Sequence, residues 1–403
     1  MKIIVQKFGG TSVADASVRE KVKDKVQQAI RNGYAPVVVV SAMGRKGAPY
    51  ATDTLIGVLK EENISVNVRE MDVMMCCGEI ISSCVMAACL QKSGINAMAL
   101  TGGQAGIITD SQFGAARIKN IKVTNLMRLL EAGIIPVVCG FQGVTENNFK
   151  FTTLGRGGSD TTAAALGAAL HADCVEIYTD VEGIMTADPR IVKEPTIMES
   201  ISYAEVCQMA HNGAKVIHPR AVEIAMSSNV PMYIKSTFSD EPGTLITNET
   251  SKNAGADIAL SSAAGVANLS GLTQFRVALD PQDVVAGQKL FVDLAEAGIS
   301  VGILNLSENN AMFAVFAEDQ SKTVEVLDNA GFKYEVNEKC GKVTLVGSGM
   351  GGVPGVMARF VAALASNNIK IYQTVDSDIT IAAIVKEECL AEAVNAIHKA
   401  FEL

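Results

Sequence analysis

The sequence predicts an α/β protein with a mostly parallel sheet, followed by a smaller α+β part. Two observations predict the first part, which covers about 245 residues: short apolar runs alternate with segments of helical periodicity, and the runs are rich in β-branched residues. The third observation is a weak internal repeat with a period of about 70 residues beyond residue 250. A chain of 403 residues also exceeds the usual size of a single core, so at least two domains are expected.

The apolar runs of the first part are the expected strands. Ile3–Val5 is the first of them, and Val22 and Val26 belong to a following helix that Gly33 ends. Four further runs have the same style, which is typical of strands buried on both faces of a parallel sheet. They are residues 36–40, 97–100, 134–139 and 175–178.

The part beyond residue 250 begins with a linker-like stretch at 251–257 and then shows the order strand, helix, strand, strand, helix twice. A small sheet of this kind has one face to cover and exposed edges, so we expect it to join two chains as a dimer. The matching segments of the two copies are 275–279 with 343–346, 297–301 with 367–371, and 311–316 with 379–384.

Composition excludes several classes of protein. The chain is 48% hydrophobic with a net charge of −9, which is typical of a globular protein and argues against nucleic acid or an anionic membrane as the main partner. It starts without the apolar core of a signal peptide and has no run of about 18 uninterrupted apolar residues. Its nine cysteines are an odd number without C-x-x-C spacing, which indicates reduced thiols and a cytoplasmic protein.

Small and polar residues follow five of the expected strands. In open α/β sheets the carboxyl ends of the strands form the edge where ligands bind, so five such loops together favour a binding site. Tight turns that need Gly and Ser are the alternative for any one loop. The loops are residues 7–12, 41–44, 101–103, 140–143 and 179–180.

One of these loops and a further Gly-rich segment have the residues that a phosphoryl-transfer site needs. Lys7 and the Gly-rich turn after it lie between a strand and a helix, where backbone N–H groups and a cation favour phosphate, although no Walker A motif is present. Residues 153–162 combine three glycines with Arg156 and Asp160 before an Ala-rich helix. Helix capping needs only part of that set. Arg156 can hold a carboxylate by two hydrogen bonds, and Asp160 can act through Mg²⁺ or on the Lys7 ammonium.

Other polar residues allow two interpretations. Asp180 and the segment 186–190 suit a nucleotide pocket or a plain turn, and Lys215 is either a second site cation or a surface lysine. His218 precedes a proline and is interpreted as a structural or capping residue. Glu79 lies in an apolar helical stretch and needs a partner, which is either a nearby Arg or Lys or the amino group of a substrate.

Taken in order, these motifs resemble those of the aspartate kinases, which have the amino-acid kinase fold. The resemblance covers essentially the whole chain, and the C-terminal repeat resembles the tandem ACT domains of that family. The opening residues and the stretch 44–53 look closest to the short aspartokinase I type of Gram-positive bacteria, which is controlled by meso-diaminopimelate. The motifs are residues 7–12, 40–44, 78–79, 140–143, 155–160, 179–183 and 186–190.

The resemblance implies a three-layer α/β/α catalytic domain at 1–247, a linker at 248–262, and ferredoxin-like ACT domains at 263–335 and 336–403. It implies ATP-dependent phosphorylation of the side-chain carboxylate of L-aspartate to 4-phospho-L-aspartate, with Mg²⁺ accompanying ATP and no confident metal ligand among the side chains. Because a carboxylate with a pKa near ~4 is already ionised, no general base is needed, and the missing catalytic His is expected.

The family's roles pass to matching positions of this chain. Lys7 and Asp160 would be catalytic. The ATP site would contain Lys7, Phe8, Gly9, Gly10, Ser41, Thr179, Asp180, Met185, Asp188, Arg190 and Lys215. The aspartate site would contain Thr52, Glu79, Phe141, Gly143, Arg156, Gly157, Gly158 and Ser159, with Glu79 on the ammonium and Arg156 on the carboxylate.

The regulatory part departs from the family pattern. The loop 280–285 lacks the usual glycine, and residues 303–306 lack the Gln of the lysine- and threonine-controlled pattern, whereas 352–356 is kept. Diaminopimelate is therefore a plausible effector beside lysine and threonine. Two alternative functions stay open: another kinase of this fold, acting on glutamate, acetylglutamate or a nucleoside monophosphate, or a non-catalytic amino-acid sensor. The candidate effector residues are Asn305, Val353, Pro354, Asn368 and Ile369.

Overall fold

The computed structural model describes residues 1–214, 216–248 and 263–403. Lys215 and all but one residue of the expected linker at 248–262 therefore lie outside the described residues. The chain divides into two compact units. The first unit contains Met1–Ile184, Ile197–Cys207 and Lys215–Ser251, and the second contains Met185–Thr196, Gln208–Ala214 and Lys252–Leu403.

An eight-stranded sheet is the centre of the first unit, in the order β10-β12-β11-β9-β1-β2-β6-β3. Each pair of neighbours is parallel except β11 with β12, which confirms the predicted mostly parallel sheet. The strands are β1 (Lys2–Phe8), β2 (Tyr34–Val40), β3 (Ala97–Leu100), β6 (Ile135–Cys139), β9 (Cys174–Thr179), β10 (Ser200–Ser202), β11 (Met232–Ser236) and β12 (Thr244–Thr247).

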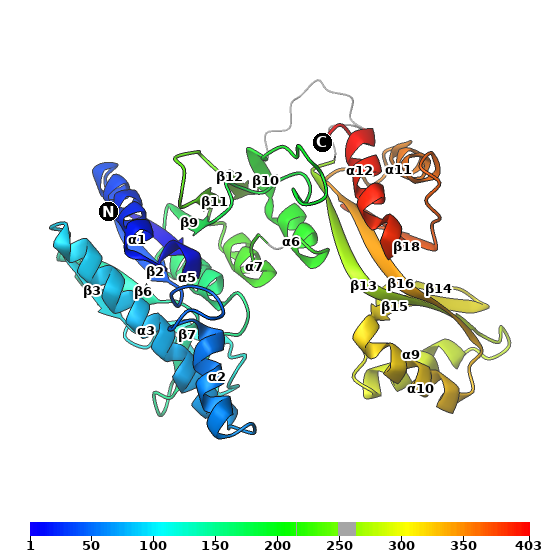
Figure 1. The fold of residues 1–403 in the computed structure, drawn as a ribbon, viewed down its shortest axis with the longest axis horizontal. Helices are drawn as coiled ribbons and strands as arrows, with labels where there is room; N and C mark the ends of the chain where they lie inside the picture. The colour runs from blue at the N-terminus through cyan, green and yellow to red at the C-terminus, as the bar shows by residue number, and fades with distance from the viewer. Residues whose placement is uncertain (215, 249–262) are drawn as a thin grey trace. The chain divides into compact units, whose positions relative to one another are not determined.

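Helices cover both faces of this sheet (Figure 1). Val22 and Val26 of α1 and Met86 and Leu90 of α3 share one buried cluster with Val38 and its neighbours in the sheet. The alanines of α5 are buried on the other face, where α5 packs against β1, β9 and α7. The helices are α1 (Ala16–Arg31), α2 (Thr52–Glu62), α3 (Val68–Lys92), α4 (Thr124–Glu131), α5 (Gly158–Ala169), α6 (Tyr203–His211) and α7 (Pro219–Ser227).

A second sheet of four strands lies in the same unit, in the order β5-β4-β7-β8. It supports the loop that follows β8, because β8 ends at Thr153, directly before the Gly-rich loop at 155–158. Its strands are β4 (Ile107–Thr109), β5 (Ile118–Ile121), β7 (Gln142–Thr145) and β8 (Phe151–Thr153).

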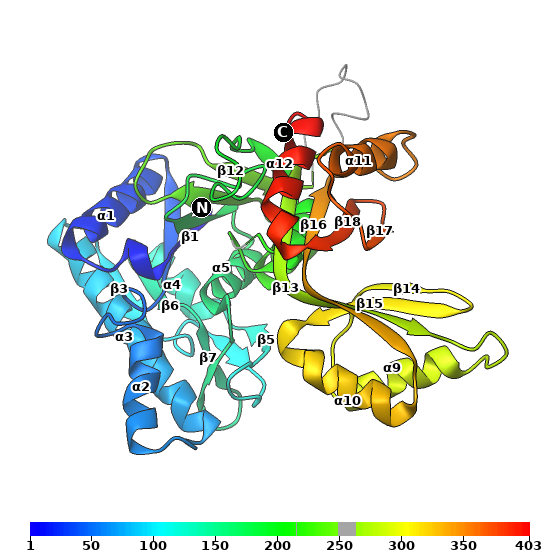
Figure 2. The ribbon, with the colours of Figure 1, turned by 45° about the vertical axis from the view of Figure 1, so that its right-hand side comes forward.

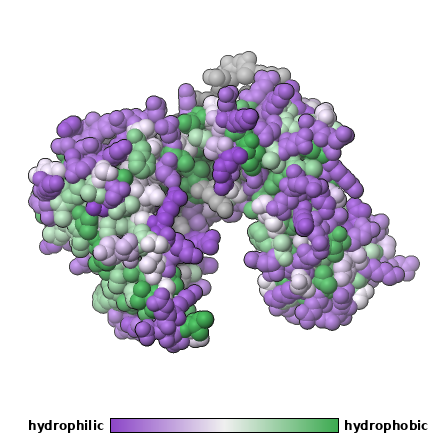
Figure 3. Space-filling view, in the orientation of Figure 1, coloured by the Kyte–Doolittle hydropathy of each residue, from purple (hydrophilic) through white to green (hydrophobic). Residues whose placement is uncertain are grey.

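Helix α3 is, among the described residues, long and apolar enough to cross a membrane by length and composition. Its packing is that of a core helix, because it contacts β3, β6 and β8 and contains the buried carboxyl groups of Asp72 and Glu79. Figure 3 shows hydrophilic residues interspersed with hydrophobic ones over α2 and α3.

The second unit contains one six-stranded sheet with the order β14-β15-β13-β16-β18-β17. In both ribbon views α9 and α10 lie together against one part of it and α11 and α12 against the other (Figure 2). The elements are β13 (Gly265–Ala278), α9 (Ala286–Glu296), β14 (Gly302–Leu306), β15 (Asn310–Phe316), α10 (Gln320–Ala330), β16 (Tyr334–Val346), α11 (Val356–Ala365), β17 (Gln373–Asp376), β18 (Thr380–Lys386) and α12 (Leu390–Ala400).

The two long strands β13 and β16 belong to both copies of the repeat. The first half of β13 pairs with the second half of β16, and Val266 lies in the same core as α11 and α12. The first half of β16 pairs with the second half of β13, and Val336 packs against the core of α9 and α10. The division expected at 335/336 therefore falls inside a strand.

The second strand of each copy starts later than the repeat predicted, at Gly302 and Gln373. The predicted segments 297–301 and 367–371 instead close the preceding helices. The N–H of Ile299 donates to Leu294 O at 2.9 Å, and the N–H of Ile369 donates to Leu364 O at 3.0 Å. Both isoleucines are buried, so their apolar character is explained by helix termination.

Candidate active site

An ion pair joins the two predicted catalytic residues in the first unit. Lys7 lies near the end of β1, and Asp160 lies in the first turn of α5. Lys7 Nζ is 2.7 Å from Asp160 Oδ1, and the two side chains are only 11% and 14% exposed. The fold thus places the Lys7 ammonium group, paired with a carboxylate, at the edge of the sheet formed by the carboxyl-terminal ends of the parallel strands.

A cavity of about 280 Å³ surrounds this pair. Most of the predicted aspartate-site residues line it together with the predicted catalytic residues, although they come from five separate segments of the chain. The lining residues are Lys7, Gly10, Ser41, Ala42, Gly44, Thr52, Glu79, Phe141, Gly155, Arg156, Gly157, Gly158, Ser159 and Asp160.

Glu79 of α3 is the most unusual group in the cavity wall. It is 2% exposed, its Oε1 accepts the Ala42 N–H at 3.1 Å, and its Oε2 has no partner among the described residues. Burial raises the pKa of this carboxyl to about 8. Because no described Arg or Lys pairs with it, the partner that the sequence left open is best supplied by the amino group of a ligand.

The amino-terminal end of α5 adds two features that favour an anion. No side chain caps this helix, and although the N–H of Gly158 donates to Gly155 O at 3.0 Å, the N–H groups of Ser159 and Asp160 can bind a ligand. Arg156 directly before it is exposed and has no hydrogen bond or ion pair with the described residues. The cavity therefore combines an unpaired acidic group, at Glu79, with an unpaired cation, at Arg156.

Glycines are required where backbone segments approach the site closely. A Cβ at Gly10 would lie 2.7 Å from both Ala42 O and Gly44 O, and one at Gly140 would lie 2.8 Å from the Ser159 side chain. At Gly157, whose φ is +67°, a Cβ would lie 2.2 Å from His218 Cβ. The glycines in these loops are therefore explained in part by the close packing of the backbone and not by ligand binding alone.

His218 has the structural role that the sequence indicated. Its Nδ1 accepts the backbone N–H of Arg220 at 3.3 Å and caps α7. Arg220 in turn donates to Leu154 O at 3.2 Å, at the start of the Gly-rich loop. Both residues therefore support the loop without lining the cavity.

Asp72 is a positioning residue that the sequence analysis missed. It is fully buried in α3, and its carboxylate accepts the N–H of Gly114 at 3.0 Å and both the N–H and the hydroxyl of Thr153 at 3.0 and 2.7 Å. It thereby fixes the end of β8 two residues before Gly155. Its signal in the sequence was a second carboxyl group in the same apolar helix as Glu79, at a spacing of seven residues.

Two predicted site residues point elsewhere. The Phe8 ring stacks on Tyr178 with centroids 4.7 Å apart in the core, because it belongs to the buried face of β1 opposite Lys7, so only its backbone can reach a nucleotide. Gly143 lies in β7, where a Cβ would meet Thr109 Cγ2 at 2.7 Å, and it does not line the cavity. Its glycine is explained by the close approach of β4.

The predicted nucleotide residues belong to both units. Gly9, Thr179 and Asp180 are in the first unit, where Asp180 Oδ2 pairs with Arg45 Nη2 at 2.6 Å at an exposed position. Met185, Asp188 and Arg190 belong to the second unit. There the Arg190 guanidinium binds both carboxylate oxygens of Asp188, with Nη2 to Oδ2 at 2.6 Å and Nε to Oδ1 at 2.9 Å.

The predicted effector residues differ in accessibility. Asn305 in β14, Pro354 and Asn368 are exposed, and Val353 is half-buried. Ile369 is only 5% exposed and lies in the core of α11 and α12. An effector would therefore have to contact the backbone of Ile369, and this assignment stays a prediction.

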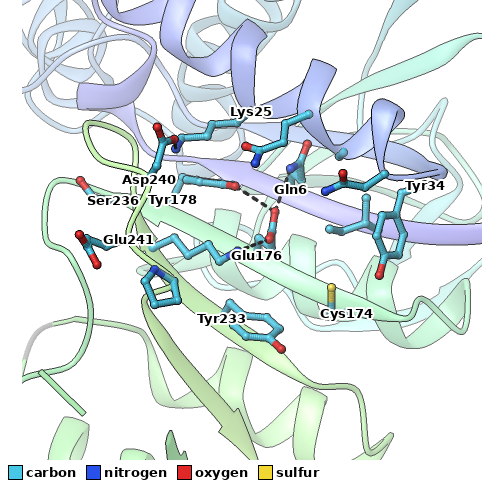
Figure 4. Close-up of a pocket in the computed structure, with 16 residues that line it drawn as sticks. Gln6, Lys25, Tyr34, Cys174, Glu176, Tyr178, Tyr233, Ser236, Asp240 and Glu241 are labelled. Atoms are coloured by element: carbon cyan, nitrogen blue, oxygen red, sulfur yellow. Dashed lines mark hydrogen bonds and ion pairs between the residues drawn. The ribbon is translucent and has the colours of Figure 1, made fainter. Parts of the chain in front are cut away.

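A second cavity, of about 300 Å³, is lined by the second half of α1 and by residues of β1, β9 and β11, and none of the predicted site residues lines it (Figure 4). Most of its charged side chains are already paired. Glu176 accepts from Gln6 Nε2 at 2.8 Å, Tyr178 at 3.0 Å and Lys235 Nζ at 2.6 Å, and Lys25 Nζ is 2.6 Å from Asp240 Oδ1. Of the charged residues that line it, Glu241 has no ion pair with another described residue, but this side chain is exposed, unlike the buried Glu79 of the first cavity.

Comparison with known proteins decides between the candidate functions. Residues 2–236 match the amino acid kinase family, and residues 335–399 match the ACT domain. Aspartokinase 1 of Bacillus subtilis (strain 168) is 45% identical over the full length of both chains. The chain belongs to the aspartokinases. The solved structure of E. coli aspartokinase III in complex with aspartate and ADP is similar to this chain, with a TM-score of 0.79 and 25% sequence identity over all of both chains. The structure of the same enzyme in complex with lysine and aspartate has a TM-score of 0.76 and 26% identity, and the match covers 99% of each chain.

Membership of this family confirms the fold and the activity expected from the sequence. The amino-acid kinase fold with its mostly parallel sheet is followed by ACT architecture, and the protein phosphorylates aspartate under feedback regulation. The two alternative functions, a different kinase of this fold and a sensor without activity, are therefore set aside.

Proposed function

We propose that the cavity around Lys7 binds aspartate and that each charged group of the substrate is bound by a residue of opposite charge. Glu79 accepts the ammonium group, and Arg156 with the first turn of α5 binds the α-carboxylate. The β-carboxylate then points at the Lys7–Asp160 pair. The observation that carries this proposal is the presence of an unpaired buried carboxyl and an unpaired arginine in one cavity of about 280 Å³.

Lys7 neutralises the charge that builds up as the γ-phosphoryl group moves to the β-carboxylate. Both reactants are anions, so their repulsion is the main barrier, and a cation placed between them lowers it. Asp160 holds the ammonium in place through the 2.7 Å ion pair. Since aspartate is already ionised at neutral pH, no residue has to act as a base.

Nucleotide binding rests on the residues that match the family motif: Ser41, Thr179, Asp180, Met185, Asp188, Arg190 and Lys215, with the backbone of Phe8, Gly9 and Gly10. Among the described residues no group of three or more His, Cys, Asp or Glu could hold a metal ion. Mg²⁺ would enter with the ATP phosphates and neutralise part of their charge.

Regulation is proposed to occur through a homodimer of the ACT region, with an amino acid as effector. E. coli aspartokinase III, in the structure that matches at a TM-score of 0.76, binds lysine and aspartate. For this chain diaminopimelate, lysine and threonine are the effectors to compare, with Asn305, Val353, Pro354 and Asn368 as the candidate contacts. The edge strands β14 and β17 offer unpaired backbone groups to a second chain.

A hydroxylamine trap for acyl phosphate tests the proposed roles. The enzyme is supplied with ATP, Mg²⁺ and single amino acids, and product is expected with L-aspartate. Lys7→Ala should abolish turnover while the fold persists, whereas Lys2→Ala, at an exposed position of the same strand, should behave like the wild type. Wild-type turnover in Lys7→Ala would contradict the role given to Lys7.

A further inference from the structure

The segment Met185–Thr196 leaves the first unit at Ile184 and returns to it at Ile197, yet it packs as part of the second unit. This segment carries three of the proposed nucleotide residues, Asp188 and Arg190 among them. The residues packed around this segment therefore determine the position of the Asp188–Arg190 pair. These residues belong to the second ACT copy.

Apolar contacts fasten both ends of the segment to that copy. Ala187 and Val192 are 4% and 7% exposed and belong to the same buried cluster as Ile397 and Phe401, at the carboxyl-terminal end of the chain. Ile191 packs against the same cluster. Because Asp188 and Arg190 lie between Ala187 and Val192, the packing of these two residues against the core of α12 restricts the position of the pair.

A buried polar contact completes the attachment. Thr186 is 7% exposed, and its Oγ1 lies 2.9 Å from Nε2 of His398 in α12, which is 8% exposed. The same Oγ1 accepts the N–H of Thr196 at 3.1 Å, and Thr186 O accepts the N–H of Val266 at 2.7 Å. Asn395, also in α12, donates to Ile191 O at 3.2 Å.

His398 is therefore the one ring in α12 that meets the base of the nucleotide segment. A hydroxyl that already accepts the Thr196 N–H keeps its own hydrogen for a neutral imidazole nitrogen. Burial lowers the pKa of His398 from its ordinary value, which keeps the ring neutral and able to accept. Removing the ring would leave the Thr186 hydroxyl buried without this partner.

We propose that His398 is a positioning residue for ATP: by holding Thr186, it fixes the Asp188–Arg190 pair, so that the second ACT copy sets the affinity for nucleotide and leaves that for aspartate unchanged. This inference rests on the nucleotide role proposed for Arg190. It assigns a part in the reaction to a residue of the regulatory repeat.

The test compares KM for ATP with KM for aspartate in the full-length enzyme. His398→Leu keeps the apolar volume and removes the ring nitrogen, and His398→Gln keeps a polar atom near the position of Nε2. We expect His398→Leu to raise KM for ATP about tenfold, the equivalent of one hydrogen bond, with KM for aspartate unchanged. His398→Gln should restore most of the loss. Lys399→Gln, at the exposed neighbouring position in α12, is the matched control.

A second variant separates failure of this inference from failure of the nucleotide role. Arg190→Ala should raise KM for ATP by itself. If it does and His398→Leu changes neither KM, the inference is overturned. If Arg190→Ala changes nothing, the nucleotide role is wrong instead, and the inference fails with it. Equal rises of both KM values in His398→Leu, without rescue by His398→Gln, would show a merely structural residue and would also overturn it. Thermal unfolding of each variant checks that the second unit is folded.

Discussion

Glu79 offers the sharpest test of the active site, because one substitution changes two measurable quantities. The Glu79→Gln variant keeps the shape of the side chain and the oxygen that accepts the Ala42 N–H. It removes the ability to ionise. The native carboxyl is 2% exposed, and its pKa is raised to about 8 by burial.

The first quantity is the free energy of unfolding. In the unfolded chain the carboxyl ionises near 4.5, whereas in the native protein it stays protonated up to about 8. The native state thus binds the extra proton between these values, so stability is full below pH 4.5 and falls as pH rises toward 8. At pH 7 the loss amounts to about 3 kcal/mol. This pH dependence should disappear in Glu79→Gln, as urea unfolding at pH 5 and pH 7.5 would measure.

The second quantity is the number of protons released on binding. A substrate ammonium favours the ionised carboxylate, so aspartate binding at pH 7 should expel close to one proton from Glu79. Calorimetry in two buffers of different ionisation enthalpy measures that number directly. In Glu79→Gln no such proton is released, and Kd for aspartate should rise about 10- to 100-fold with the loss of a charge-assisted hydrogen bond.

Either of two results would refute the reasoning. Aspartate binding to the wild type without proton release at pH 7 would mean that Glu79 does not receive the ammonium. Unchanged Kd in Glu79→Gln would mean the same. Glu70→Gln, at an exposed position of the same helix, is the control and should change neither quantity.

Other predictions concern the framework of the site. Asp72→Ala should lower the free energy of unfolding by about 3 kcal/mol, because it leaves the buried N–H of Thr153 and the partly buried N–H of Gly114 without an acceptor; a melting temperature equal to that of the wild type would contradict this. Gly10→Ala should abolish most activity, because the added Cβ would lie 2.7 Å from two carbonyl oxygens. Gly133→Ala is the control: its Cβ would have no neighbour within 4 Å, so this variant should show only the effect of backbone strain. Activity assays of the two variants check this difference. Light scattering should give a dimer, and a monomeric mass with and without effector would exclude the proposed assembly.

Much of the fold was predictable from local pattern. The β-branched run at residues 36–40 became a buried central strand, and the turn residues after each strand meet at one edge of the sheet, which brings Lys7, Ser41 and Asp160 to one cavity. These features depend on nearby residues and on the topology of parallel sheets.

The misses have three different causes, of which the first is a contact between distant segments. Nothing in the apolar helix 68–92 indicates that Asp72 will meet Thr153, 81 residues later in the chain. Phe8 follows the motif but belongs to the opposite face of its strand from Lys7, a matter of side-chain alternation that a motif does not contain. Ile299 and Ile369 have the β-branched composition of strands but end helices, because tertiary burial decided their place.

The sharing of β13 and β16 sets a minimum length for any separate regulatory chain. Residues 265–269 complete the sheet beneath α11 and α12, so a polypeptide that started at residue 336 would leave Phe360 and its neighbours without the strand that contains Val266. A fragment that starts ahead of Gly265 keeps this strand in both cores, although it lacks Ala187 and Val192, which also belong to the core of α11 and α12. The two ACT copies therefore share one sheet, and we expect a fragment that contains only the last copy to expose the apolar face of α11 and α12.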